Sequence, residues 1–447
     1  MSSTAPNPIL ILTPRALLGS LFSFEALLVL YMFAANFKAS PRFAWIPFDP
    51  TGLFFALSVV VGSFIIVFNP IHKKALPVIF AMVCLVTWLM VSQAWSPSRI
   101  YGPGKVFSMA TLALWSVIAG ALIIAPDPER LRRLFTLLAL FGIWMGVESV
   151  LAYLEGGGNV ERIRNLDSGG YLTMGRIVGL GGLVALAGWM SARSRMAGWF
   201  CLALFIALGF VLAIGGGRGP LLATGLALLI PIALSVRLTL RRFWYSRTLL
   251  AVLLVPLLAA GALALYTTVT EHRLGTIDRI ESLMQGDLRG SAAARADLYR
   301  ETNEMWQRAP LLGQGIGGWP VLAGYGDNRV YPHNLFAELL VEGGMVALAL
   351  FLAMVGVALR SASLERMRRD PQALCAMMLL ANTVLNAMVS SDLPGNRAMF
   401  MMLGVLALFA IRPVGARARG EARRRHTIES LAPPTPAASP ASQREAV

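Results

Sequence analysis

Apolar runs long enough to cross a membrane recur along the whole chain, and they constrain the fold more than any other feature of the sequence. They occupy about 16–37, 51–68, 75–95, 105–125, 131–154, 171–191, 198–216, 219–236, 248–268, 335–359, 373–391 and 397–412. Each run is close to the ~20 apolar residues that a transmembrane helix requires. Hydrophobic residues make up 56% of the chain and charged residues only 14%, which excludes a soluble multidomain protein and a nucleic-acid-binding domain. The sequence therefore predicts an all-α polytopic membrane protein with about 12 transmembrane helices.

Basic residues are shared unevenly between the loops on the two sides of these helices. About 22 Lys and Arg fall on the side that holds both termini, against about 8 in the opposite short loops. The positive-inside rule therefore places both termini in the cytoplasm. The first run lacks the flanks of a cleavable signal, so we expect it to act as its own insertion signal.

The chain divides into four segments by composition. They are 1–268 with transmembrane helices 1–9, 269–334 as one long outer loop, 335–412 with helices 10–12, and 413–447 as a cytoplasmic tail. The outer loop contains two amphipathic helices, at about 273–285 and 291–308, and Pro310 ends the second. The tail is rich in Arg and Pro and lacks the apolar content to fold, so we expect it to be disordered.

This topology gathers on the outer face the polar residues that are hardest to explain by packing. They are Arg218, Arg295, Arg300, His333, Asn334, Asp392, Asn396 and Arg397. Arg218 stands in the glycine-rich turn 215–219, where the backbone can approach a bulky anion and the guanidinium can bind phosphate; snorkelling to the headgroups is its alternative role. Arg295, by composition alone, is typical of a solvated charge. His333 follows Pro332 where the loop re-enters the membrane, and it either accepts a proton from a sugar hydroxyl, binds phosphate, or simply starts a helix.

Polar stripes mark several of the apolar helices. Asn334, Glu338 and Glu342 share one face of helix 10, and Asn382, Asn386 and Ser390 share one face of helix 11. Hydrogen bonding between these two stripes is the expected arrangement, with a substrate cavity as the alternative. Glu148 and Arg176 fall at matched depth on helices 5 and 6, and we expect an ion pair between them.

Neither the glycine-rich segment 313–318 nor the spacing of His, Asp and Glu residues predicts a cofactor or metal site. The segment 313–318 looks like a nucleotide-binding loop, but no strand precedes it, so a flexible turn is the better interpretation. No His and carboxylate spacing suits a metal ion, so we expect neither a metal site nor a cofactor.

Motifs in the outer loops resemble the O-antigen ligase and O-antigen polymerase superfamily. They are Arg295-Ala296-Asp297-Leu298-Tyr299, Trp306, Pro310-Leu311-Leu312-Gly313, Gly315, His333-Asn334-Leu335-Phe336, Glu338 to Gly344, the Gly-Arg-Gly of 217–219 and Trp95-Ser96-Pro97. One departure concerns the ligase pattern, in which Gly-Thr follows the glycine matched by Gly344. Here Ala347-Leu348 stands instead, and the choice between ligase and polymerase stays open.

The resemblance implies a fold, an activity and a site. The fold is that of a C-type glycosyltransferase with a periplasmic catalytic loop, in the bacterial inner membrane. The activity is metal-independent, inverting transfer of a glycan from undecaprenyl diphosphate, either to lipid A–core by a ligase or to a growing chain by a polymerase. Arg218 and Arg295 match the phosphate-binding arginines and His333 the essential histidine. Arg300, Asn334, Asp392 and Arg397 are expected to add substrate contacts.

A membrane transporter is the competing class. It predicts inverted repeats and helices broken near the middle of the membrane. The sequence shows no internal repeat, and its interrupted turn at 215–219 lies at the edge of the membrane. The sequence therefore favours the enzyme.

Overall fold

The computed structural model is helical in nearly all of the part that it describes, which is 9–11, 13–34, 47, 49–155, 170–215, 217–235, 237–239, 242–244 and 291–412. The predicted span 248–268, the loop helix 273–285 and the tail 413–447 lie outside these residues.

The N-terminal half is a series of long helices with short interruptions. Its elements are α1 (Pro14–Leu21), α2 (Phe24–Met32), α4 (Pro50–Phe68), η2 (Lys73–Ala75), α5 (Leu76–Ser92), η3 (Gln93–Trp95), α6 (Tyr101–Ser108), η4 (Met109–Ala113), α7 (Leu114–Ile118), η5 (Ala119–Ile124), α8 (Pro128–Glu155), α10 (Gly170–Ser191), α11 (Arg195–Ile214), α12 (Arg218–Ala227) and α13 (Leu229–Ser235). The segments η4 and η5 are π-helical, so α6 to η5 form one continuous span with two widened turns.

The C-terminal half adds a short hairpin and the remaining helices. Its elements are β1 (Arg237–Thr239), β2 (Arg242–Trp244), α16 (Ser291–Arg308), α17 (Gly318–Leu322), α18 (Leu335–Leu359), α19 (Leu364–Arg369), α20 (Pro371–Ala387), η6 (Leu393–Gly395), α21 (Arg397–Val405) and α22 (Leu408–Ile411). The two strands pair antiparallel, with Leu238 opposite Phe243. The helix expected at 291–308 is confirmed as α16.

Seven helices in the described part are long and apolar enough to cross a membrane. They are Pro50–Phe68, Lys73–Trp95, Tyr101–Ile124, Pro128–Glu155, Gly170–Ser191, Arg195–Ile214 and Leu335–Leu359. The pair α1 and α2, bent by 59°, makes an eighth if counted as one span, and Arg218–Leu234 and Arg397–Ile411 are shorter apolar helices. An all-α membrane protein is thus confirmed, while the number 12 remains a prediction.

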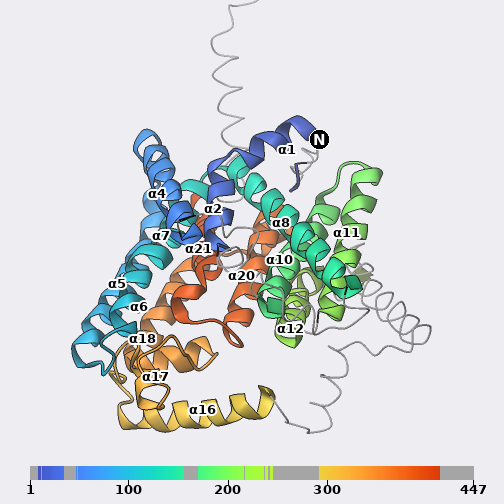
Figure 1. Ribbon diagram of the computed structural model, residues 1–447. Helices are drawn as coiled ribbons and strands as arrows, with labels where there is room; N and C mark the ends of the chain where they lie inside the picture. Colours follow the sequence, from blue (N-terminus) through green and yellow to red (C-terminus); the bar gives the residue numbers. More distant parts are fainter. Residues whose placement is uncertain are drawn as a thin grey trace, which may run out of the picture. The chain divides into compact units, whose positions relative to one another are not determined.

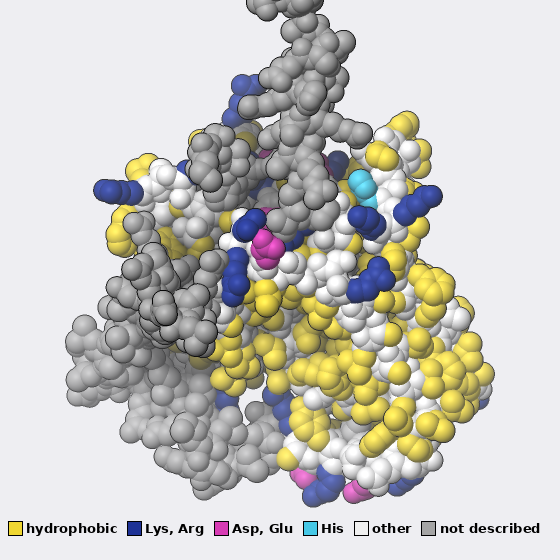
Figure 2. All heavy atoms as spheres, turned by 180° about the vertical axis from the view of Figure 1, so that it is seen from behind, with side chains coloured by type: hydrophobic (Ala, Val, Ile, Leu, Met, Phe, Trp, Pro, Cys, Tyr) yellow, Lys and Arg dark blue, Asp and Glu magenta, His cyan; other side chains and the backbone are white. Residues whose placement is uncertain are grey.

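The face of the molecule drawn in Figure 2 is apolar in its middle and charged toward its two ends. In Figure 2 hydrophobic side chains cover the middle of the visible face, and Lys and Arg gather above them. That upper end carries α1 in Figure 1, whereas α16 lies at the opposite end. This is the distribution expected of a bundle that spans a bilayer.

Helix α10 is the most buried of the spans and organises the bundle around it. It packs against α8, α11, α12 and α20. Gly142 of α8 faces Gly181 of α10 so closely that a Cβ on Gly142 would lie 2.9 Å from the Cα of Gly181. Small residues allow such close backbone contact, which increases dispersion attraction where water supplies no driving force.

Helix α18 is broken in its first half at Gly344. This residue has φ 67° and ψ −168°, which opens the helix. The segment after Pro310 enters the opening, where the N–H groups of Gln314 and Gly315 donate to the carbonyls of Val341 and Glu342 at 2.7 and 2.9 Å. The interpretation of 313–318 as a flexible turn was therefore wrong, because its backbone satisfies carbonyls that the break leaves open.

The motif Trp95-Ser96-Pro97 binds the same glycine-rich segment from the other side. Trp95 donates from Nε1 to the Gly313 carbonyl at 3.2 Å, and Ser96 donates from Oγ to the Ile316 carbonyl at 2.7 Å. Two motifs that are distant in sequence thus form one structural unit at the end of the bundle near α16.

Asp327 fixes the rest of the outer loop to the start of α6. Its carboxylate accepts hydrogen bonds from Ser98 Oγ at 2.5 Å and from the N–H groups of Arg99, Ile100 and Tyr101 at 2.6, 2.6 and 3.0 Å. Burial alone would raise the pKa of Asp327, but these four donors lower it to about 2. The carboxylate therefore stays ionised at neutral pH and anchors the loop.

Candidate functional site

A cavity of about 220 Å³ lies between α10, α20, α21 and the loop that precedes α18. Three arginines line it, each from a different segment: Arg176 from α10, Arg329 from the loop and Arg397 from the start of α21. The remaining lining includes Thr173, Tyr331, Asn382, Thr383, Asn386, Ser391 and Asn396, with an apolar floor of Met32, Phe33, Leu180, Ala398 and Met399. Three guanidinium groups beside amide groups and hydroxyls suit a polar anion.

Among the three arginines of the cavity, Arg176 is the one with buried hydrogen-bond donors that lack a partner in the described part of the chain. Its Nε and Nη2 atoms are buried, and no hydrogen-bond partner for them exists among the residues described. The ion pair expected with Glu148 does not form, so that prediction was wrong; matched depth on adjacent helices did not determine which way the two side chains point. Buried donors without partners are costly, so Arg176 is suited to bind a ligand in the cavity.

Arg329 is held in place by Asp392. Its Nε and Nη2 donate to the two carboxylate oxygens at 2.8 and 2.9 Å, and Tyr101 donates to the same carboxylate at 3.3 Å. Burial alone would raise the pKa of Asp392, but the hydrogen bonds and charge of Arg329 lower it, and Asp392 in turn raises the pKa of Arg329. Asp392 is only 1% exposed, so its observed role is to orient Arg329 rather than to contact the cavity directly.

Arg397 is oriented by α2. Its Nη1 donates to the Tyr31 carbonyl at 2.8 Å, and its guanidinium lies 5.2 Å from the centroid of the Tyr31 ring. This contact fixes the charge at the wall of the cavity.

His333 lies beside this cavity, in the loop directly before α18. Its φ of 57° is in the left-handed region, and its ring packs edge-on against Tyr331 at 4.6 Å. Its Nδ1 is buried and has no partner within the described residues. Burial lowers the pKa of His333, the positive charges of Arg295 and Arg176 lower it further, and Asp392 opposes them. The three charged groups are therefore close enough to interact with the imidazole, which is neutral at pH 7.

Arg218 and Arg295 approach this region from two more helices. Arg218 is the first residue of α12 and is half-buried. The next residue packs just beyond the end of α20, because a Cβ on Gly219 would lie 2.9 Å from Val389. Arg295 is half-buried on α16 and interacts electrostatically with His333. Neither residue, nor His333, is part of the lining of the cavity described above.

Two other predicted contacts have structural partners. Asn334 caps α18, since its Oδ1 accepts from the N–H groups of Phe336 and Ala337 at 3.0 Å each. Arg300 is exposed on α16 and pairs with Asp297 at 2.8 Å. Their predicted substrate contacts stay predictions.

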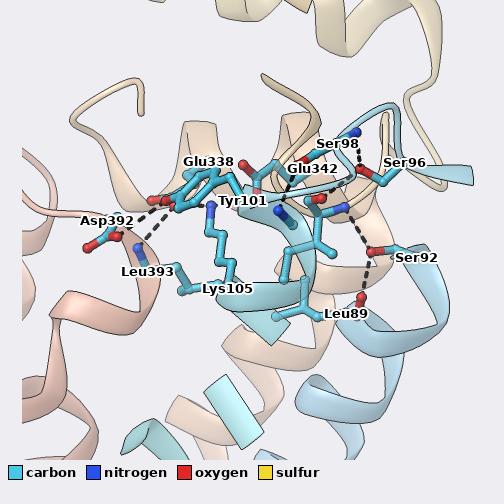
Figure 3. Close-up of polar contacts among 12 residues, drawn as sticks. Leu89, Ser92, Ser96, Ser98, Tyr101, Lys105, Glu338, Glu342, Asp392 and Leu393 are labelled. Atoms are coloured by element: carbon cyan, nitrogen blue, oxygen red, sulfur yellow. Dashed lines mark hydrogen bonds and ion pairs between the residues drawn. The ribbon is translucent and has the colours of Figure 1, made fainter. Parts of the chain in front are cut away.

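A fully buried ion cluster lies next to the Asp392 loop (Figure 3). Lys105 of α6 binds Glu338 at 2.5 Å and Glu342 at 2.6 Å, both on α18. The expected hydrogen bonding of these carboxylates to the stripe on helix 11 was wrong; within α20, Asn386 binds Asn382 instead. Helical phase shows which residues share a face, but it does not show which helix that face meets.

The ion cluster is linked to the cavity indirectly, through the Asp392 loop. Glu338 Oε1 accepts from the N–H of Leu393 at 3.0 Å, and the preceding residue is Asp392, which orients Arg329. Two carboxylates share one ammonium group, and Glu338 Oε2 and Glu342 Oε1 have no partner in the described part of the chain. Replacing such a cluster by apolar residues is often neutral or stabilising, whereas removing one partner alone is strongly destabilising.

The sequence missed Arg176, Arg329 and Lys105 as residues of this region. Arg176 and Lys105 carried a signal, since each is a charge within or beside an apolar run. Arg329 lies in a polar loop that offered none.

These features define a helical membrane protein with an arginine-lined cavity and a neutral histidine at the end of the bundle near α16. Residues 202–352, about a third of the chain, match the family described as O-antigen ligase. The match includes Arg218, Arg295 and His333 and confirms the resemblance to the O-antigen ligase and polymerase superfamily. No curated protein matches the chain.

Proposed function

We propose that the protein is a membrane glycosyltransferase that moves a glycan from undecaprenyl diphosphate to an acceptor hydroxyl, most simply as an O-antigen ligase acting on lipid A–core. It would work at the periplasmic face of the bacterial inner membrane, with both termini in the cytoplasm. The observation that carries the proposal is Arg176, which lines the cavity together with Arg329 and Arg397 and whose buried donors have no partner among the described residues. We place the diphosphate of the donor there.

The chemistry follows from charge development. As the bond from the anomeric carbon to the diphosphate oxygen breaks, negative charge builds on the leaving diphosphate. Fixed guanidinium groups stabilise that charge without a metal ion, and we assign this role to Arg218 and Arg295 together with Arg176. The acceptor oxygen forms the new bond from the opposite face of the sugar, which inverts its configuration, and its proton passes to His333.

Removing Arg176 tests the cavity. Arg176→Ala is expected to lower kcat by about 10²–10³, the cost typical of losing one preorganised donor to a developing anion. The measurement is transfer in proteoliposomes with purified lipid-linked donor. Arg308→Ala is the matched control, since Arg308 is an exposed arginine at the end of α16. Equal activity of the two variants would show that the diphosphate does not bind in this cavity.

The three residues predicted to be catalytic are tested in the same assay. Arg218→Ala, Arg295→Ala and His333→Ala are each expected to stop transfer while the protein still inserts and folds. Near-normal turnover in any one of them would exclude that residue from the mechanism.

The pH dependence of kcat tests His333 as the base. Because its pKa is below the ordinary 6.5, the imidazole is neutral at pH 7 and charges only on acidification. We expect a plateau near neutrality and a loss of activity with a midpoint below pH 6.5. Arg295→Gln removes a charge that lowers this pKa, so the midpoint of the His333 titration, followed by NMR of the imidazole, should move upward in this variant. A flat profile, or a midpoint that moves downward in Arg295→Gln, would contradict the assignment.

A polymerase of the same superfamily is the second candidate, and the acceptor separates the two. A ligase requires lipid A–core, whereas a polymerase extends lipid-linked donor alone. In a deletion strain, bare core with accumulated lipid-linked polymer indicates a ligase, and core with a single repeat indicates a polymerase.

The break in α18 bears on the transporter alternative, because transporters use broken helices to bind ions with freed carbonyls. Here the carbonyls of Val341, Glu342 and Gly343 accept from Gln314, Gly315 and the Trp88 indole. They are satisfied by the protein itself, which favours the enzyme.

A further inference from the structure

Asn386 lines the cavity and carries a buried acceptor. Its Nδ2 donates to the Asn382 carbonyl at 2.9 Å and to Asn382 Oδ1 at 3.1 Å. A carbonyl oxygen only accepts, so these bonds fix the orientation of the amide and leave Oδ1 on the other side. Asn386 is 3% exposed, and its Oδ1 has no partner among the residues with described positions. A buried acceptor left unpaired is costly, so a ligand that donates a hydrogen bond fits here.

Arg176 and Asn386 lie at the same level on facing walls of the cavity. Gly179 of α10 faces Asn382 of α20, since a Cβ on Gly179 would lie 3.6 Å from Asn382 Nδ2. Arg176 precedes Gly179 by about one turn and Asn386 follows Asn382 by about one turn, and the two helices run in opposite directions. With a rise of 1.5 Å per residue, Arg176 and Asn386 both lie about 5 Å from the contact between Gly179 and Asn382, in the direction of the outer loop.

Arg176 on α10 and Asn386 on α20 would bind two different chemical groups of one ligand. The Nε and Nη2 donors of Arg176, which have no partner in the described residues, suit an anion. The Oδ1 of Asn386, which likewise has none, suits an O–H or N–H group next to that anion. In a glycosyl diphosphate the phosphate is bonded to the anomeric carbon, and the next ring carbon carries a hydroxyl or an acetamido N–H. The first sugar of a lipid-linked donor thus provides both groups side by side.

We propose that Asn386 is a specificity-determining residue, whose Oδ1 accepts a hydrogen bond from a hydroxyl or amide N–H of the first sugar of the donor, while Arg176 binds the adjoining phosphate. This proposal rests on the glycosyltransferase function proposed above. It assigns Asn386 to substrate selection, whereas Arg218, Arg295 and His333 serve the transfer itself.

The experiment compares donors that each lack one hydrogen-bond donor of the first sugar, by replacement of a single hydroxyl or amide with hydrogen. The wild-type protein is expected to prefer the intact donor over one of these analogues by about 10²-fold or more in kcat/KM. In Asn386→Leu, which has similar volume and no polar atom, that preference should fall to within a few-fold of unity. Asn386→Asp retains the acceptor oxygen and should retain the preference.

The outcomes separate this proposal from the one on which it rests. If the wild-type protein transfers no glycan from any lipid-linked donor, the glycosyltransferase function fails, and this proposal with it. If the wild-type protein transfers and Asn386→Leu discriminates against every analogue as strongly as the wild type does, only the role of Asn386 is overturned. Asn386→Ala, which adds no bulk, serves in the same comparison should Asn386→Leu not accumulate.

Discussion

Replacing Lys105 with Met is expected to destabilise the protein by about 3–5 kcal/mol, the cost typical of removing one partner of a buried ion pair. The change leaves Glu338 and Glu342 facing each other without a cation, in a place where neither carboxylate reaches solvent. It also loosens the contact of Glu338 with the Leu393 N–H, and through it the loop that orients Arg329. We expect little folded protein in detergent and a large drop in melting temperature.

Two controls make this prediction specific to the ion cluster. Lys74→Met removes an exposed lysine near the start of α5 and should leave the melting temperature unchanged. The triple variant Lys105→Met, Glu338→Gln, Glu342→Gln carries no charge in this cluster and should recover most of the stability. If Lys105→Met melts like Lys74→Met, the cluster does not support the fold.

Replacing Gly344 with Ala is expected to prevent correct folding of α18. A Cβ at this position would lie 2.1 Å from the Leu311 carbonyl oxygen and 2.6 Å from the Gly313 nitrogen, and backbone atoms cannot move aside as a side chain can. The backbone conformation of Gly344 is in addition nearly exclusive to glycine and costs about 1–3 kcal/mol in any other residue. The segment that follows Pro310 would have to leave the break, so we expect loss of monodisperse protein on size exclusion.

Gly356 offers a matched control in the same helix. A Cβ there meets nothing within 4 Å, so Gly356→Ala should be neutral or stabilise the helix by about 0.5–1 kcal/mol. Equal behaviour of the two variants would show that the break in α18 does not depend on the glycine.

Individual helices were the most predictable part of this protein. Runs of apolar residues identify a membrane helix locally, which is why the expected spans coincide with helices wherever the structure describes them. The helix over 291–308 was equally predictable from the sequence, because its amphipathic pattern and the proline that follows it are local signals.

The candidate site was predictable only in part. Motifs and topology grouped His333, Arg295 and Asp392, and the structure places these three residues close enough to interact electrostatically. Their roles in a site stay predictions. Motifs and topology did not reveal that Asp392 is buried against Arg329, or that Arg176 is open to a cavity. Both facts depend on which helices are neighbours, and a hydropathy pattern does not predict which helices pack together.

The sequence by itself determined that this is a helical membrane protein, because the cost of placing polar backbone and charge in lipid is decided residue by residue. Only the tertiary structure decided how charges are partnered: Lys105 with two glutamates, Arg329 with Asp392, Arg176 with no protein group in the described part. The energy of a buried charge depends on the distance to its counter-charge, and that distance is fixed by packing between segments that are far apart in the chain.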